Sequence, residues 1–286
     1  MEHLMSVEPI RETKDLLIYK TILDGKKVFV KQAKTEGGDV FNKREFYNQE
    51  FLRNITQNQV AGFEFLEPSL NGRSLIYPDI SEQVKWLAAE LGSETPITPL
   101  PEYSNEMIKF LKFCLQIPYD KIPEEIRIDS AKRLENVPKN FLIDANYLLD
   151  NQIISQAQLE TMKSCIEKAA DPNNQAFQHH DVVPWHMAQD KSDGKLILVD
   201  ANWAGWSLKY YDVAYYILQM IGYAERTAEA QDFLNIIKKE LAEDRQLKET
   251  LAIPLSYRGV RLAAELHRKQ KVKNAQEVMG LVLSEI

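Results

Sequence analysis

The chain contains very little cysteine. Only Cys114 and Cys165 occur in 286 residues, and neither belongs to a C-x-x-C pair. A disulfide framework is therefore excluded, and a reducing cytoplasm is the expected location. Cys114 lies in an apolar helical stretch with Phe110, Leu111 and Phe113, which predicts a thiol buried in the core.

Long apolar runs are also missing. No stretch of about eighteen apolar residues occurs, so no segment is expected to span a membrane. The N-terminal residues lack the basic flank and apolar run of a secretory signal. We therefore expect a protein that is not associated with a membrane.

The sequence also lacks an excess of positive charge. Lys and Arg number 35 against 42 Asp and Glu, which gives a net charge of −7. This balance excludes a general nucleic-acid binder and is compatible with a cationic substrate. With 44% hydrophobic and 27% charged residues, the composition is typical of an ordinary globular protein with room for one large domain or two small ones.

The first eighty residues predict a small β-rich region with one helix. Residues 16–23 and 27–32 form two strand candidates around Asp24-Gly25, a dipeptide that favours a tight hairpin turn. The apolar spacing over 41–55 suits a helix. Further strands are expected at 62–68 and 73–77, joined by a turn at Asn71-Gly72.

The rest of the chain reads as mostly helical. Residues 92–102 contain three prolines and predict a loop, and a short β-like island covers 176–200. The predicted fold class is therefore α+β, with a boundary between 1–79 and 80–286. Helices are expected at 81–91, 103–116, 128–149 with a break at Pro138, 153–170, 208–221, 226–242 and 256–284.

The chemistry concentrates in one stretch near the middle of the chain. Three of the five histidines lie close together, at His179, His180 and His186, on either side of Asp181. An apolar strand then ends at Asp200. A carboxylate at a strand end, with a second one on a loop, is well suited to hold a divalent cation and orient a nucleophile.

These motifs resemble the aminoglycoside phosphotransferase and choline kinase group, which has a protein-kinase-like fold. The resemblance rests on His179-x-Asp181-x-x-Pro184-Trp185, on Leu198-Val-Asp200 with the Ala-Gly-Trp that follows, on Tyr211-Asp212-Val-Ala214, and on Val28-Phe-Val-Lys31. It covers about residues 10–220. It implies a bilobal protein: a small antiparallel-sheet lobe at 1–79 that binds the nucleotide, and a larger helical lobe at 80–286 that carries out catalysis and binds the substrate.

The resemblance also implies roles for single residues. Asp181 would take the proton of the substrate hydroxyl, and Asp200 would hold Mg²⁺ between the phosphate groups of ATP. Lys31 would bind these phosphates and would itself be held by a helix carboxylate, with Glu45 preferred slightly over Glu50. The remaining expected residues are Tyr77 and Asp79 for nucleotide binding, and His179 and Asp212 as structural support of the loop.

Three departures from the group's pattern matter for this assignment. His186 occupies a metal-ligand position that is usually Asn, and an imidazole suits Mn²⁺ better than Mg²⁺. Phe29 occupies a position that usually holds a smaller residue facing the adenine. No G-x-G-x-x-G loop occurs between residues 7 and 20, which separates the chain from protein kinases.

Three hypotheses follow. The first is an ATP-dependent phosphotransferase that acts on a hydroxyl of a small aminoglycoside-, choline- or sugar-like molecule, which requires Lys31, Asp181 and Asp200 to face one cleft. The second, motivated by His186 and Phe29, is a weak or inactive kinase-fold protein that binds a nucleotide or a partner. The third is a metal hydrolase that uses the histidine cluster.

Trp185, Trp203 and Trp206 near the loop suit either an aromatic wall for a cationic substrate or core packing, and the basic C-terminal helix suits a solvated face.

Overall fold

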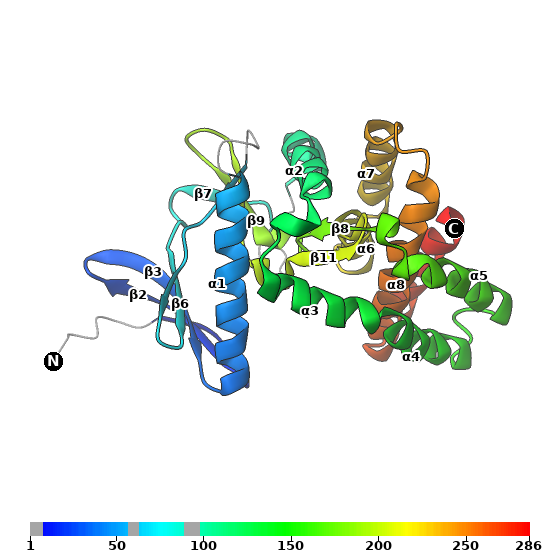
Figure 1. Cartoon of the computed structure of the whole chain (residues 1–286), viewed down its shortest axis with the longest axis horizontal. Helices are drawn as coiled ribbons and strands as arrows, with labels where there is room; N and C mark the ends of the chain where they lie inside the picture. Colours follow the sequence, from blue (N-terminus) through cyan, green and yellow to red (C-terminus); the bar gives the residue numbers. More distant parts are fainter. Residues whose placement is uncertain (1–7, 57–62, 89–97) are drawn as a thin grey trace. The chain divides into compact units, whose positions relative to one another are not determined.

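A computed structural model describes residues 8–56, 63–88 and 98–286 of the chain (Figure 1). The chain divides into two compact units. The first comprises residues 1–87 together with 186–203, and the second comprises 88–185 together with 204–286. The first unit is thus discontinuous in sequence, because a segment from the middle of the chain folds with the N-terminal residues.

The first unit contains a five-stranded antiparallel sheet in the order β1-β2-β3-β6-β5. The hairpin of β2 and β3 has Asp24 and Gly25 at its tip, with φ of 49° and 77°. Positive φ at both central residues is the geometry of the two-residue turn that matches strand twist, so the predicted hairpin is confirmed. The strands are β1 Glu8–Glu12, β2 Leu16–Leu23, β3 Lys26–Ala33, β5 Ser69–Asn71 and β6 Ser74–Pro78.

Helix α1, Glu36–Thr56, packs on β3 and β6, and Figure 1 shows it as the long blue helix of the first unit. It begins before the predicted residue 41. Its first turn passes so close to the preceding chain that a Cβ on Gly38 would lie 2.3 Å from the Asp15 carbonyl oxygen. Only glycine fits there, which allows the helix to start this early.

The buried face of α1 is polar as well as apolar. Leu52 is fully buried, and so are the side chains of Asn42, Glu45 and Gln49. Buried polar groups need partners, so this face is built to make specific hydrogen bonds rather than only to fill space. It positions the candidate site described below.

A second sheet of the first unit has the order β4-β10-β9-β7 and unites segments that are far apart in sequence. Val84, Ala188 and Ile197 form a small core on it. The strand β10 pairs parallel with β4 and antiparallel with β9. The strands are β4 Phe63–Phe65, β7 Val84–Trp86, β9 Met187–Asp190 and β10 Leu196–Leu198.

Two predictions in this region are wrong. The segment expected as a helix over 81–91 contains the strand β7, since Val84 is buried against the distant residues Ala188 and Ile197; residues 89–91 lie outside the described residues. The turn at Asn71-Gly72 joins β6 to β5 rather than to the strand expected at 62–68. That earlier segment forms β4, whose partner is β10.

The second unit consists of helices around a short antiparallel hairpin of β8 and β11. Its helices are α2 Ser104–Gln116, α3 Glu124–Glu135, α4 Val137–Asp150, α5 Gln156–Ile166, α6 Tyr211–Gly222, α7 Thr227–Glu240, α8 Leu247–Arg268 and α9 Val272–Glu285. The strands are β8 Gln175–Gln178 and β11 Gly205–Leu208. Short 3₁₀ turns of this unit occur at Leu100–Glu102, Tyr119–Lys121, Glu167–Ala170 and Pro172–Asn174. A further one at Ala201–Trp203 belongs to the first unit, and one at Pro184–His186 crosses from the second unit into the first.

The helix predicted over 256–284 is two helices. Helix α8 starts at Leu247 and runs through a buried Pro254, and the chain turns at Gln270, with φ of 61°, before α9 begins. The two helices pack closely, since a Cβ on Gly259 would lie 2.3 Å from Cγ2 of Val282. The break expected at Pro138 separates α3 from α4, and Pro138 lies in the first turn of α4, where a proline costs no hydrogen bond.

Neither cysteine is in a disulfide, and Cys114 is fully buried as predicted. None of the helices in the described part of the chain is long and apolar enough to cross a membrane.

Candidate active site

In the first unit, Lys31 of β3 lies between two carboxylates. Its Nζ is 2.8 Å from both oxygens of Glu45 and 3.6 Å from Oδ1 of Asp200. Burial by itself would lower the pKa of the ammonium, but the charges of Asp200 and Glu45 outweigh this and raise it. Lys31 is therefore a permanently charged group held at a defined point.

The carboxylate that reaches Lys31 is that of Glu45 and not that of Glu50. The Asn42 amide, one turn earlier on α1, donates to the Lys31 carbonyl at 2.7 Å and to the Arg73 carbonyl at 2.9 Å. These two bonds connect α1 to strand β3 and to the residue that precedes β6. Since side chains three residues apart share a helix face, Glu45 is directed at the Lys31 ammonium.

Asp200 follows β10 and adopts a left-handed backbone conformation, with φ of 65°. The turn after it is clamped to α1. The Asn48 amide donates to the Ala201 and Asn202 carbonyls at 2.9 and 3.0 Å, and Nε of Arg44 donates to Oδ1 of Asn202 at 2.8 Å. Strained conformations persist only where the surroundings enforce them, and these bonds do so.

Sequence reasoning missed Arg44, Asn48 and Asn202. The available signal was the polar face of α1, whose amides recur at Asn42, Asn48 and Gln49 among apolar positions. Trp203 also has a local partner. The Arg44 guanidinium lies 4.2 Å from its ring centroid, so this face of the indole is already covered by a cation of the chain itself.

His186 is the second candidate metal ligand of the first unit. Its Nε2 lies 4.0 Å from Oδ2 of Asp200, and both side chains are partly exposed. The Val199 N–H donates to the His186 carbonyl at 3.0 Å, which holds this residue beside β10. A carboxylate oxygen and an imidazole nitrogen at this separation fit a single divalent cation, with a donor set that favours Mn²⁺ over Mg²⁺.

The two expected nucleotide-binding residues at the end of β6 have different surroundings. The Tyr77 hydroxyl is buried and donates to Oε1 of Glu45 at 2.9 Å, so it completes the shell around Lys31. Asp79 is not part of this group. Its carboxylate contacts the Lys20 ammonium at 3.1 Å and accepts from the Ser81 N–H at 3.0 Å.

In the second unit, Asp212 organises the loop that carries Asp181. Its two carboxylate oxygens accept the backbone N–H groups of His179 and His180 at 2.7 and 2.6 Å. Its own N–H donates to Gln178 at 3.0 Å. Burial raises the pKa of Asp212 to about 7, although the two N–H groups act in the opposite direction.

The histidines of the loop differ in their surroundings. His179 is fully buried, packs edge-on against Phe110 and accepts the Asp181 N–H on Nδ1 at 3.4 Å. Nδ1 of His179 is therefore not available as a metal ligand, as the metal-hydrolase hypothesis would require. His180 has a left-handed backbone with φ of 71°, and its ring lies on Tyr211 with centroids 4.3 Å apart.

The Asp181 carboxylate faces Tyr215 of α6. Burial, and then the negative charge of Asp181, raises the pKa of the Tyr215 phenol. The Arg258 guanidinium of α8 lies over that ring, with Cζ 4.7 Å from the centroid. The prediction of a fully solvated basic face on this helix is wrong at Arg258, whose Nε is buried. Neither Tyr215 nor Arg258 was singled out by the sequence motifs.

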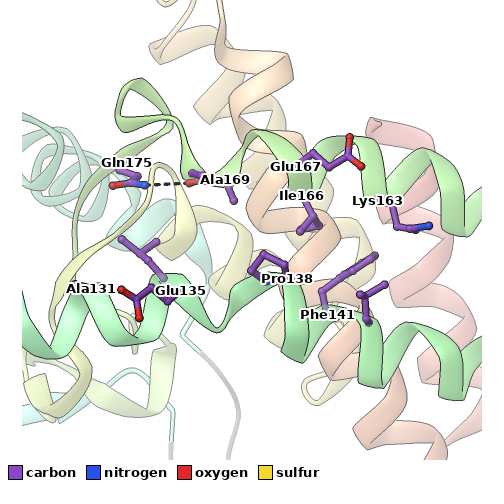
Figure 2. A pocket seen from close by; sticks show the side chains of 12 residues that line it. Ala131, Glu135, Pro138, Phe141, Lys163, Ile166, Glu167, Ala169 and Gln175 are labelled. Atoms are coloured by element: carbon purple, nitrogen blue, oxygen red, sulfur yellow. Dashed lines mark hydrogen bonds between the residues drawn. The ribbon is translucent and has the colours of Figure 1, made fainter.

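A pocket of about 580 Å³ lies elsewhere in the second unit, between α3, α4 and the end of α5 (Figure 2). Apolar side chains such as Pro138, Phe141 and Ile166 line it, with Glu135 and Glu167 among its polar residues. None of the candidate site residues lines it, and its side chains offer no arrangement that phosphoryl chemistry would use, so no catalytic role is assigned to it.

No family model and no curated protein matches the chain in sequence. Solved structures do match it over nearly its whole length. Macrolide 2'-phosphotransferase type I has a TM-score of 0.63 at 14% identity, covering 98% of this chain and 91% of that one. Spectinomycin phosphotransferase, solved with ADP and its antibiotic, has 0.61 at 13%, covering 99% and 93%. The choline kinase LicA from Streptococcus pneumoniae has 0.57 at 15%, covering 99% and 95%.

The chain has the protein-kinase-like fold. The predicted resemblance to aminoglycoside phosphotransferases and choline kinase is thus confirmed at the level of structure, and so is the α+β class with its antiparallel N-terminal sheet and helical C-terminal part. Nucleotides occur in several matching structures, including GDP and AMP-PNP, the latter with Ca²⁺ in an amicoumacin kinase. A fold hosts many activities, so the function must be argued from the residues.

Proposed function

We propose that the protein is an ATP-dependent phosphotransferase that transfers the γ-phosphoryl group of ATP to a hydroxyl of a small molecule. The observation that carries this proposal is the position of Lys31, whose ammonium lies 2.8 Å from the Glu45 oxygens and 3.6 Å from Asp200. A buried, correctly oriented cation next to a partly exposed carboxylate is what nucleotide phosphates require. Small-molecule phosphotransferases among the structural neighbours support the same conclusion.

In this proposal the first unit binds the nucleotide. Glu45 keeps the ammonium in place from the buried side, because its two short contacts and the Tyr77 hydroxyl leave the carboxylate no freedom. The longer contact to Asp200 is the one that opens when phosphate oxygens approach Lys31. The ammonium then acts as a point charge on the phosphates.

Asp200 and His186 would hold the divalent cation, which supplies charge neutralisation at the phosphate oxygens when it is bound. The clamp of Asn48 and Arg44 on the turn after Asp200 fixes the direction of that carboxylate. His186 offers a nitrogen where an amide oxygen is usual in the group that the sequence resembles, so we expect Mn²⁺ to serve at least as well as Mg²⁺.

Asp181 is the proposed base. Its carboxylate would accept the proton of the substrate hydroxyl while the hydroxyl oxygen forms a bond to the γ-phosphorus, and the bond from that phosphorus to the β-γ bridging oxygen breaks to release ADP. Asp212 and His179 position the base through the loop backbone, as their hydrogen bonds to the N–H groups of residues 179–181 indicate.

The test is a coupled ADP-release assay over small hydroxylated metabolites and antibiotics, run in parallel with Mg²⁺ and Mn²⁺. We expect turnover with at least one acceptor, and Asp181→Asn should lower kcat by about 10²- to 10⁴-fold. Nucleotide affinity should be unchanged in that variant. Asp232→Asn is the matched control, because Asp232 is exposed on α7 and should behave as wild type. Full activity in Asp181→Asn would reject the assignment.

His186 favours a second candidate, a kinase-fold protein that binds nucleotide but transfers phosphate weakly or not at all. Its nitrogen is a poor ligand for Mg²⁺, the usual partner of ATP. A thermal-shift titration with ATP and each metal separates the two candidates. Stabilisation by nucleotide together with no ADP release on any acceptor would favour this second function, and measurable transfer would reject it.

A further inference from the structure

The surroundings of Asp181 within the second unit carry information about the substrate. Tyr215 faces the carboxylate, and the Arg258 guanidinium lies over the Tyr215 ring, with Cζ 4.7 Å from its centroid. Tyr211 stacks on Tyr215 with centroids 5.9 Å apart and also carries the His180 ring. The proposed base is therefore bordered by aromatic rings and a guanidinium.

Arg258 has unused hydrogen-bonding capacity. Among the residues that the structure describes, it forms no ion pair, and its Nε is buried without a hydrogen-bond partner. Other arginines of α8 are engaged: Arg261 donates to the Tyr257 hydroxyl at 2.8 Å, and Arg268 donates to Asp144 at 2.9 Å. Stacking on Tyr215 occupies the face of the guanidinium and leaves the N–H donors in its plane available.

The acids whose charges reach this guanidinium are Glu265 and Asp181. Glu265 is already engaged, since it accepts hydrogen bonds from Lys269 and Tyr223, and Asp181 is the proposed base. The His180 ring also faces this region, and its Nε2 is buried with no hydrogen-bond partner among the described residues. Burial, and then the charges of Arg133, His179 and Arg258, lowers the pKa of His180 well below its ordinary value.

We propose that Arg258 binds an anionic group of the phosphoryl acceptor, so that the substrate is a hydroxylated carboxylate or phosphate rather than a polycation. This inference rests on the proposed function for the hydroxyl end of the substrate. Arg258 lies farther than ion-pair distance from the Asp181 carboxylate but still within reach of its charge. A molecule that presents a hydroxyl to Asp181 can thus present an anionic oxygen to the guanidinium.

The substrate class differs from that expected at first. An acidic chain and a tryptophan cluster are compatible with a cationic substrate, but the Trp203 ring is covered by Arg44 and Trp206 donates to Gln175 at 3.1 Å. Within the second unit, the charge of Asp181 reaches Tyr215, Arg258 and the buried Asp212. Arg258 is the cation of this set. A polycation would meet Arg258 at the cost of like-charge repulsion, whereas an anion forms charge-assisted hydrogen bonds with it.

The test compares acceptors that differ in one group: glycerol, glycerate, glycerol 3-phosphate and ethanolamine. Their binding is measured by saturation-transfer NMR on the full chain with AMP-PNP and Mn²⁺ present, and KM and kcat follow from ADP release for those that react. We expect one of the two anions to bind about tenfold or more tightly than glycerol and ethanolamine. The preferred anion distinguishes a carboxylate substrate from a phosphate substrate.

Three variants test whether Arg258 is responsible for the preference for the anion. Arg258→Gln should raise KM, or the dissociation constant, of the anion about 10- to 100-fold and leave the KM of ATP unchanged. Arg258→Lys should retain most of the preference, which also guards against a folding defect in the first variant. Arg268→Gln removes a charge from the end of the same helix and should match wild type.

A preference for glycerol or ethanolamine, equal binding of all four compounds, or an anion preference that survives in Arg258→Gln would overturn the inference. Failure of the proposed function gives a different result. In that case no acceptor is phosphorylated and AMP-PNP does not bind, while the anion preference still reports on Arg258.

Discussion

The Lys31 ammonium and the Glu45 carboxylate form a symmetric buried ion pair, with Nζ 2.8 Å from each carboxylate oxygen. The pair links β3 to α1, and the Tyr77 hydroxyl of β6 adds a third element. A buried ion pair is weak evidence for stability, because desolvation of two charges offsets their attraction. The need for an oriented cation beside Asp200 is the better explanation of a buried ion pair at this position.

Breaking the pair on one side should destabilise the protein strongly. Glu45→Gln leaves the Lys31 ammonium without its main partner, and we expect a loss of about 3–5 kcal/mol in the free energy of unfolding, measured by urea denaturation. Glu50→Gln on the same helix should change it by less than about 0.5 kcal/mol. The double variant Lys31→Met, Glu45→Leu should regain most of the stability and none of the nucleotide affinity. A double variant that still binds ATP normally would contradict the role given to Lys31.

The clamp on the turn after Asp200 gives a second prediction. Asn48→Leu removes the donor to two carbonyls, those of Ala201 and Asn202, which should cost about 3 kcal/mol of stability. It should also weaken binding of Mn²⁺ with ATP, since Asp200 loses its support. Asn54→Leu, an exposed position of α1, is the control and should alter neither quantity. Unchanged metal affinity in Asn48→Leu would mean that Asp200 is held by other contacts.

Local patterns were sufficient for part of this structure. The Asp24-Gly25 turn determines the β2–β3 register because only a few residues adopt positive φ readily, and this information lies within the turn itself. The resemblance likewise implies a carboxylate near Lys31 but leaves Glu45 and Glu50 open. Five residues correspond to about 140° around a helix, so the choice depends on which face of α1 is buried.

Other features depend on contacts that no local window contains. The strand β7 exists because residues from about a hundred positions later, in β9, pair with it, and propensity alone favoured a helix there. The sequence predicts a helix only from residue 256, after Pro254, whereas α8 already begins at Leu247. In the structure Pro254 is buried among other helices, whose packing offsets the lost hydrogen bond. The sequence predicts a solvated Arg258 on the same helix, because its partner Tyr215 lies on a different helix, α6.

Asp212 predicts a specific dependence of stability on pH. Burial raises its pKa from the ordinary 3.8 to about 7, so the folded protein keeps a proton that the unfolded chain releases between these values. The stabilising contribution is complete below pH 3.8 and is lost as the pH rises to 7. The stability of wild type relative to Asp212→Asn should therefore fall by up to about 4 kcal/mol from pH 4 to pH 7 in urea denaturation.

Asp232→Asn serves as the control for this series, because Asp232 is exposed and the difference from wild type should be flat across the same pH range. The prediction is contradicted if the free energy of unfolding of wild type, relative to that of Asp212→Asn, rises with pH. The backbone N–H groups of His179 and His180 would then dominate over burial, and the carboxylate would be the favoured form.

His186 sets the last prediction, on metal preference. The His186 Nε2 lies 4.0 Å from Oδ2 of Asp200, the other proposed ligand. Replacing His186 with Asn exchanges this imidazole nitrogen for an amide oxygen, the donor type that Mg²⁺ prefers. The ratio of kcat/KM with Mn²⁺ to that with Mg²⁺ should drop about tenfold in His186→Asn, equivalent to about 1.4 kcal/mol. His267→Asn, on a ring that contacts Tyr147 of α4, is the matched control and should leave the ratio unchanged. If His186→Asn keeps the wild-type ratio, His186 is not a ligand, and Asp200 must hold the cation with other oxygen donors.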